Sequence, residues 1–211
     1  MINASSSASD YKPIDSGAYV ARCYSMVHIG TIEQEFQGEK KEVNKVRISW
    51  ELPTEMKVFK EGEEAKPLAI GKEFTLSLHE KANLRKFLES WRGKGFTEDE
   101  AKKFDITKLL GVPCMLSVIH KTSKQGKLYA EISSISTLPK GMACPEQINK
   151  NFEFTLEQFD NEKFDSLPDW LKDKIKTSKE YRAMNDPTLN DSAPDDTDDT
   201  INPEAGSDLP F

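Results

Sequence analysis

The chain has 211 residues, which is enough for one domain of ordinary size with an appendage or for two small domains. Hydrophobic residues make up 36% of it, below the roughly 45–50% usual in globular proteins, so part of the chain should lie outside any core. No apolar run reaches the roughly 18 residues that a transmembrane helix needs, which excludes such a helix. Residues 1–10 also lack the basic start and apolar stretch of a signal peptide, so we expect a cytoplasmic protein with no membrane partner.

Negative charge is concentrated near the C-terminal end of the chain. The formal net charge is -7, from 29 basic and 36 acidic residues. Eight of those acids lie from Asp186 onward, where there is no Lys or Arg, which leaves residues 1–185 with 29 basic and 28 acidic residues. A polyanionic partner therefore remains compatible with the body of the protein, because the excess negative charge lies mostly outside it.

Residues 1–16 are rich in Ser, Ala and Asp, and we expect them to form a flexible arm. Strand-like segments follow, rich in β-branched and aromatic residues. The first, residues 17–30, is long enough to curve across two sheets. In the second, residues 43–52, apolar and polar side chains alternate, and Pro53 should end the strand because proline cannot continue a ladder. A third strand is predicted over residues 74–79.

The periodicity then changes from that of a strand to that of a helix. Leu84, Phe87, Leu88 and Trp91 lie at helical spacing and form one apolar stripe. A short second helix is predicted over residues 98–104, with Thr97 and Glu100 as its capping box.

Strand periodicity returns at residues 112–121 and 127–135, joined by a tight turn at Gly126. Five strands with a helix between the third and the fourth form the element order of an OB-fold. The sequence therefore predicts a mainly-β domain over residues 17–138, a five-stranded OB-fold barrel with a helix between strands 3 and 4. An open α+β sandwich is the alternative, because alternation alone does not show barrel closure.

The C-terminal part of the chain is less regular. Residues 139–184 are predicted to be an irregular segment with one extra helix over residues 168–181, which Ser166 would cap and which would pack on the body through Trp170, Leu171 and Ile175. Residues 185–211 consist mostly of Asp, Thr, Pro, Asn and Ser. Such a segment cannot bury enough apolar area to offset its ordering entropy, so we expect a disordered acidic tail.

Signatures of enzymes and metal sites are absent from the sequence. His79-Glu80 begins a H-E-x-x-H zinc motif, but Asn83 occupies the position of the second histidine. The three cysteines, Cys23, Cys114 and Cys144, contain no C-x-x-C pair, which argues against a zinc knuckle or a disulfide framework and favours a reducing compartment. We therefore expect neither catalysis, nor a cofactor, nor a metal.

Basic and aromatic residues alternate with the apolar positions of the predicted strands. Cations that follow phosphates and flat side chains that stack on unpaired bases are what a single-strand-binding surface requires. These positions lie on the first two strands and on two hairpin loops, where an OB-fold binds oligonucleotides. The candidate DNA-binding residues are Arg22, Tyr24, Phe36, Lys45, Arg47, Trp50, Lys121, Lys124, Lys127 and Tyr129. Of these, Trp50 alternates with the apolar set, so core packing is its alternative role.

The first predicted helix carries a further set of basic residues. Lys81, Arg85 and Arg92 share the face opposite the apolar stripe. A solvated face is the simpler interpretation, and a track for phosphates or a partner surface is the alternative.

The most specific motif is the terminal segment DDTDDTINPEAGSDLPF. Its last residues, Asp208, Leu209, Pro210 and Phe211, resemble the acidic tip of bacterial single-stranded DNA-binding proteins, which ends Asp-Ile-Pro-Phe. The body instead resembles a widespread bacteriophage protein family in the segments WELP (50–53), SLHEKANLRKFLESWRG (77–93) and LPDWLKDKI (167–175).

This resemblance implies a phage-encoded protein with an OB-fold that coats single-stranded DNA during replication or recombination, without strong sequence preference. The tip would then bind replication or recombination proteins of the host or the phage, in the cytoplasm of the host bacterium, and self-association is possible. The alternative is an OB-like adaptor for other proteins, whose acidic tail mimics DNA and captures a DNA-processing enzyme.

Overall fold

The computed structural model describes residues 12–36 and 38–186. Almost all of the predicted disordered tail, residues 187–211, lies outside the described residues, and so does the partner-binding tip Asp208, Leu209, Pro210 and Phe211. Most of the predicted N-terminal arm lies outside them as well.

Strands dominate the described part of the chain and form one sheet. Its order is β3-β2-β1-β4-β5, and each of these neighbours is antiparallel. A short sixth strand pairs in parallel with the middle of β1. The strands are β1 (Gly17–Phe36), β2 (Glu39–Lys57), β3 (Lys66–Thr75), β4 (Pro113–Thr122), β5 (Leu128–Ser136) and β6 (Phe152–Phe154).

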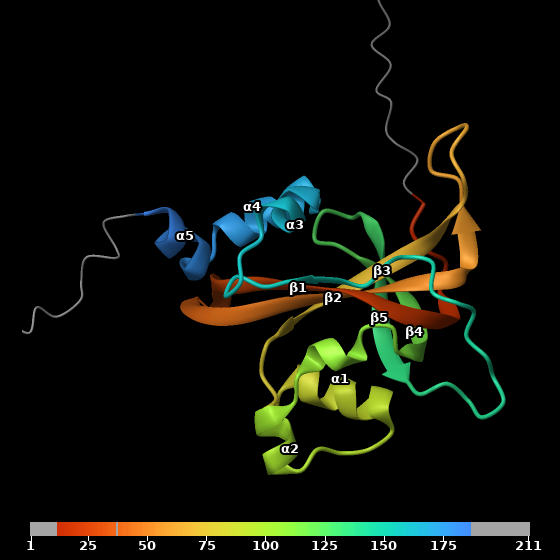
Figure 1. The fold of residues 1–211 in the computed structure, drawn as a ribbon, viewed down its shortest axis with the longest axis horizontal. Helices are drawn as coiled ribbons and strands as arrows, with labels where there is room; N and C mark the ends of the chain where they lie inside the picture. The colour runs from red at the N-terminus through yellow and green to blue at the C-terminus, as the bar shows by residue number, and fades with distance from the viewer. Residues whose placement is uncertain (1–11, 37, 187–211) are drawn as a thin grey trace, which may run out of the picture.

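Helices cover the sheet in two groups. Figure 1 shows α1 and α2 on one side of the long strands β1 and β2, and α3, α4 and α5 on the other. The helices are α1 (Asn83–Arg92), α2 (Glu98–Lys103), α3 (Asn161–Ser166), α4 (Asp169–Lys176) and α5 (Lys179–Asn185), with a 3-10 turn, η1 (Ile106–Leu109), after α2.

Because the β1–β2 pairing is irregular, the side chains of β1 pack into two separate cores. The register shifts between Cys23 and Ser25 and again between His28 and Gly30. Before these shifts β1 contributes Cys23 to the first core. Val27 and Ile29 instead pack into a second core. Because side chains alternate across a strand, a one-residue irregularity exchanges the two faces.

The first core lies between the strands and α1, with Trp50, Leu88 and Leu116 almost fully buried. The second core joins β1 to the C-terminal segment through β6, α3 and α4, and its aromatic centre is formed by Phe154 and Phe164. Through this second core the segment after residue 138 packs against β1.

The predicted closed five-stranded barrel needs correction, because the structure is an open, mainly-β sheet of six strands. Among the described residues no ladder joins β3 to β5, although these two strands lie side by side. The Lys72 side chain spans the seam instead, and its Nζ donates to the Ile132 carbonyl at 2.6 Å.

Several predicted elements agree with the structure and others differ in extent. The helix stripe, the capping box at Thr97 and the turn with Gly126 at φ 78° are confirmed. The predicted third strand, residues 74–79, lies too far along the sequence, since β3 ends at Thr75. Pro53 does not end β2, because an irregularity between Leu52 and Met56 lets the strand pass the proline without a ladder bond.

The single C-terminal helix expected over residues 168–181 is wrong in detail. Two short helices, α4 and α5, begin within this range, and Ser166 ends the preceding helix, α3, instead of capping α4. Ser178 interrupts the predicted helix because its hydroxyl accepts from the Tyr181 amide and caps α5.

Candidate nucleic-acid interface

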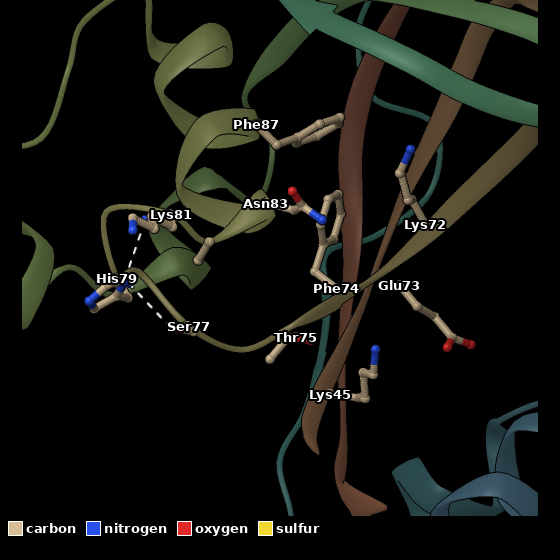
Figure 2. A pocket seen from close by; sticks show the side chains of 11 residues that line it. Lys45, Lys72, Glu73, Phe74, Thr75, Ser77, His79, Lys81, Asn83 and Phe87 are labelled. Carbon is tan, nitrogen blue, oxygen red and sulfur yellow. Dashed lines mark hydrogen bonds between the residues drawn. The ribbon is translucent and has the colours of Figure 1, made fainter. Parts of the chain in front are cut away.

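A cleft of about 570 Å³ lies between the end of β3 and the start of α1. Its lining includes Lys45 of β2, Lys72 of β3 and Lys81 of the turn before α1, all labelled in Figure 2. Phe74 and Phe87 form its apolar wall, with ring centroids 4.8 Å apart. The cleft thus combines three cations with an aromatic surface, although only Lys45 was among the predicted site residues.

The turn before α1 is ordered by local hydrogen bonds. The His79 amide donates to Ser77 Oγ at 3.3 Å, and the Lys81 amide donates to His79 Nδ1 at 3.4 Å. The helix then begins after Ala82 with no side-chain cap, and no acidic residue lies in its first turn. The start of α1 is therefore a favourable environment for negative charge at the edge of the cleft.

Two glutamates near the cleft, Glu73 and Glu131, each interact with two lysines. Burial lowers the pKa of Lys45, with Glu73 opposing this effect and Lys174 adding to it. Glu131 pairs with both Lys72, at 3.6 Å, and Lys121, at 3.0 Å. Burial acts to raise the pKa of Glu131, but its hydrogen bonds and charge interactions with these lysines outweigh burial, so its pKa is lowered. Glu131 thus links the cleft to the β4–β5 hairpin.

The β4–β5 hairpin carries four of the predicted site residues on exposed positions. Lys121 lies opposite Tyr129 in the ladder, so the two side chains share one face of the hairpin. Tyr129 is 37% exposed. Lys124 lies in the turn and Lys127 follows it, and both are exposed as well. This group is connected to the cleft through Glu131, which pairs with Lys121 of the hairpin and with Lys72 of the cleft.

Arg22 has a different environment from the one predicted. Its guanidinium donates to the carbonyls of Gly111, at 2.7 Å, and Pro145, at 2.9 Å. Its ladder partner Glu51 is fully buried and accepts from the amides of Ile148 and Asn149. These two charged side chains hold the loop after β5 against the sheet, so Arg22 is a structural residue and not a phosphate contact.

Tyr24 and Arg47 lie on the other face of the sheet, beneath α4. They line a small cavity of about 170 Å³ together with Trp170. The Arg47 guanidinium carbon lies 4.7 Å from the centroid of the Trp170 ring. Glu73 pairs with Arg47 at 3.9 Å. The predicted strand face is thus partly covered by the C-terminal helices, and the C-terminal segment adds an aromatic residue to it.

Trp170 is the functional candidate that the sequence interpretation missed. It was assigned to the buried side of its helix, but the structure leaves it 51% exposed. Leu171 and Ile175, four residues apart, form the buried stripe of α4. Because each helical residue is rotated by about 100° from its neighbour, Trp170 lies at the edge of that stripe. The sequence spacing of Leu171 and Ile175 therefore already indicates that Trp170 is not on the buried side of α4.

The prediction that Trp50 contacts DNA is wrong. It is fully buried, and its ring lies 5.7 Å from those of Phe87 and Trp91. Core packing is its role, because a side chain without exposed surface cannot stack on a base. Phe36 ends β1, and its side chain lies outside the described part of the chain.

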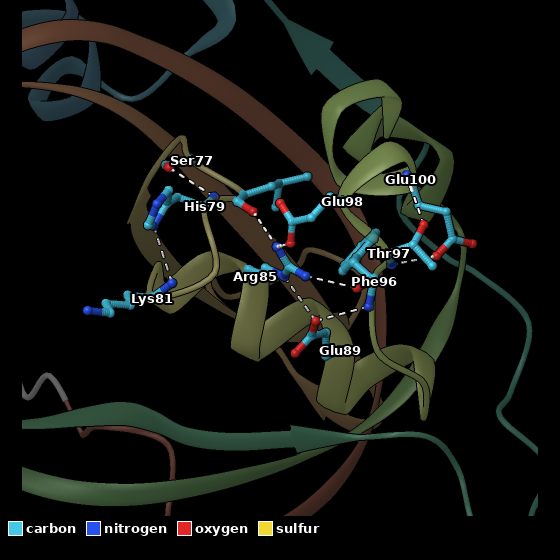
Figure 3. Close-up of polar contacts among 10 residues, drawn as sticks. Ser77, His79, Lys81, Arg85, Glu89, Phe96, Thr97, Glu98 and Glu100 are labelled. Atoms are coloured by element: carbon cyan, nitrogen blue, oxygen red, sulfur yellow. Dashed lines mark hydrogen bonds and ion pairs between the residues drawn. The ribbon is translucent and has the colours of Figure 1, made fainter.

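The basic face of α1 is not a phosphate track. Figure 3 shows Arg85 enclosed by Glu89, Glu98 and the Phe96 carbonyl, and it is only 6% exposed. Arg92 stacks on the Phe96 ring at 4.0 Å. These arginines hold α1 against the α1–α2 loop. Lys81, also shown in Figure 3, remains exposed and belongs to the cleft.

Two of the three cysteines, Cys23 and Cys114, are buried, and Cys144 is half-buried. Burial raises the pKa of Cys23 to about 12 and also raises that of Cys114. No group of three or more His, Cys, Asp or Glu residues in the described part of the chain, residues 12–36 and 38–186, could hold a metal ion. No helix in the same part is long and apolar enough to cross a membrane.

Comparison with known proteins adds no assignment: no protein-family model matches the chain, and no curated protein is similar enough to be a relative.

Proposed function

We propose that the protein binds single-stranded DNA without strong sequence preference, and that it acts in phage replication or recombination in the bacterial cytoplasm. The observation that carries the proposal is the cleft, where Lys45 and Lys81 lie beside the half-buried ring of Phe87. Lysine side chains contact phosphates regardless of sequence. Aromatic faces stack on bases of every kind, so the same surface suits a strand of mixed sequence.

The DNA path we propose runs from the cleft along the β3–β5 seam to the β4–β5 hairpin. Lys72 and Lys121 lie along it, joined through Glu131, and Tyr129 provides an exposed ring beside them. The hairpin residues Lys124 and Lys127 extend the path. An unpaired strand can expose its bases to such a surface, whereas duplex DNA keeps its bases stacked and paired.

The arrangement of strands supports an OB-like interpretation of the body. The order β3-β2-β1-β4-β5, with β3 beside β5, is the order in which an OB-fold closes. We propose that this is an OB-fold whose seam is bridged by Lys72 instead of by a ladder. The segments that carry the family resemblance also contain proposed binding residues, since Lys81 and Phe87 of residues 77–93 line the cleft and residues 167–175 contain Trp170.

Fluorescence anisotropy with three labelled ligands tests this function. The ligands are a single-stranded oligonucleotide, its duplex form and an RNA of the same sequence. We expect the single strand to bind more tightly than the duplex, with little change between mixed sequences and oligo(dT). Equal binding of duplex and single strand would contradict the proposal, and binding of neither would favour the protein adaptor instead.

The acidic segment supplies the second part of the proposal. We propose that Asp208, Leu209, Pro210 and Phe211 bind replication or recombination proteins, with the phenyl ring as the apolar anchor and the acids steering approach. Phe211→Ala in the full chain should abolish capture of such proteins from host lysate and leave DNA affinity unchanged. Recovery of the same proteins with and without Phe211 would show that the segment only improves solubility.

A further inference from the structure

We infer that Trp170, held in place by Arg47, forms a second subsite on the opposite side of β3 from Lys72, and that it stacks on one unpaired base of the bound strand. The inference rests on the proposed function, because it concerns the same single-stranded ligand. It adds a surface built by α4 that lies outside both the cleft and the β4–β5 hairpin.

The ring of Trp170 is exposed to solvent. The chain has three tryptophans, and Trp50 and Trp91 are almost fully buried while Trp170 is 51% exposed. Burying that ring would remove a large apolar area from water. The neighbouring Leu171 already anchors α4 in the second core, so the fold does not need Trp170 for packing.

The Trp170 ring is held at a fixed position before any ligand binds. The Arg47 guanidinium lies 4.7 Å from its centroid, a cation–π contact that occupies one side of the ring. Gly71 makes room for this arrangement. A Cβ at Gly71 would lie 2.6 Å from Arg47 Nη2 and 2.9 Å from Ser49 Oγ. A pre-oriented aromatic ring loses little conformational entropy when it stacks on a base.

The Trp170 subsite is connected to the cleft through an ion pair. Glu73 lines the cleft and pairs with both Arg47 and Lys174. The Arg47–Glu73 ion pair therefore connects the lining of the Trp170 cavity to the lining of the cleft. Lys174 and Arg47 place positive charge beside the ring, where the phosphates that flank a stacked base would lie.

The Trp170 cavity is large enough only for a small ligand group. Its volume of about 170 Å³ is below the roughly 300 Å³ at which pockets for drug-sized ligands begin. A single planar base suits this space, and its backbone would remain in solvent beside Lys174. Single-stranded DNA that already occupies the cleft would present such a base at high local concentration.

Tryptophan emission reports on this subsite directly, because Trp170 is the exposed one of the three tryptophans. Titration of the full chain with oligo(dT) of about 20 nucleotides, longer than one OB-fold usually covers, should quench the emission. Trp170→Phe should keep the affinity measured by anisotropy within about threefold, because phenylalanine also stacks. The same variant should remove the quenching, and quenching of wild-type amplitude in it would overturn the inference.

Affinity provides the second readout. Trp170→Ala should weaken oligo(dT) binding by about tenfold, since stacking contributes roughly 1–3 kcal/mol per base. Met184→Ala is the matched control, because Met184 is an apolar residue of α5 that is 46% exposed and lies away from the subsite. Wild-type affinity of Trp170→Ala would overturn the inference while the proposed function stands. Absence of an anisotropy change with the wild-type protein would instead contradict the proposed function, and the subsite with it.

Discussion

The Lys72 bridge across the β3–β5 seam gives a stability prediction that can be worked from the structure. Lys72→Met keeps most of the aliphatic stem but removes the donor that contacts the Ile132 carbonyl at 2.6 Å. A hydrogen bond to a charged group contributes about 1.5–3 kcal/mol. The lysine is 27% exposed, so we take a loss of about 2 kcal/mol in the free energy of unfolding. In a domain of this size that loss lowers Tm by about 4–8 °C.

Thermal unfolding followed by circular dichroism measures this effect. Lys121→Met is the matched control, because Lys121 shares Glu131 with Lys72 but is 48% exposed at its side chain. Exposed ion pairs contribute about 0–1 kcal/mol, so the control should lower Tm by less than about 4 °C. Equal Tm values for Lys72→Met and the wild-type protein would refute the idea that this side chain holds the seam.

Three further predictions concern the loop after β5, the Arg47 position and the cysteines. Glu51→Ala leaves the Ile148 and Asn149 amides without their buried acceptor, and it should lower the free energy of unfolding in urea by about 3 kcal/mol; an unchanged midpoint would contradict this role. Gly71→Ala should displace the Arg47 guanidinium and alter Trp170 emission in the free protein, whereas an identical spectrum would mean that the guanidinium stays in place. Burial raises the pKa of Cys23 to about 12 and also raises that of Cys114, so little thiolate forms at either residue at about pH 8. A thiol reagent should therefore modify half-buried Cys144 well before Cys23 and Cys114. Equal rates in the native protein would contradict this burial.

The elements could be predicted from the sequence where one face of a segment is buried. The stripe of α1 and the alternation in β2 around Trp50 each reflect a single apolar face, and both appear in the structure. The same alternation could not show the extent of β1, because its pairing irregularities direct side chains into two cores. β6 was missed because its three residues are too few to show a period.

The candidate site could be predicted only in part, because sequence patterns do not show which charges are already paired. Lys45 and Tyr129 lie on accessible surface as expected. Arg22 and Arg85 are occupied by backbone carbonyls, and those partners lie far away in sequence or in loops without periodicity. Lys72 has the parity of an inward-facing residue between Ile70 and Phe74, so the pattern alone gave no reason to place it in a cleft.

The salt dependence of oligo(dT) binding tests most directly whether the cleft holds phosphates. For a single strand the slope of log affinity against log salt changes by about 0.7 for each phosphate contact. A double variant, Lys45→Ala with Lys81→Ala, should therefore reduce the slope by about 1.4. The control pair, Lys102→Ala with Lys103→Ala on exposed positions of α2, should leave it unchanged. A wild-type slope in the cleft variant would contradict the account, because the strand would then bind elsewhere.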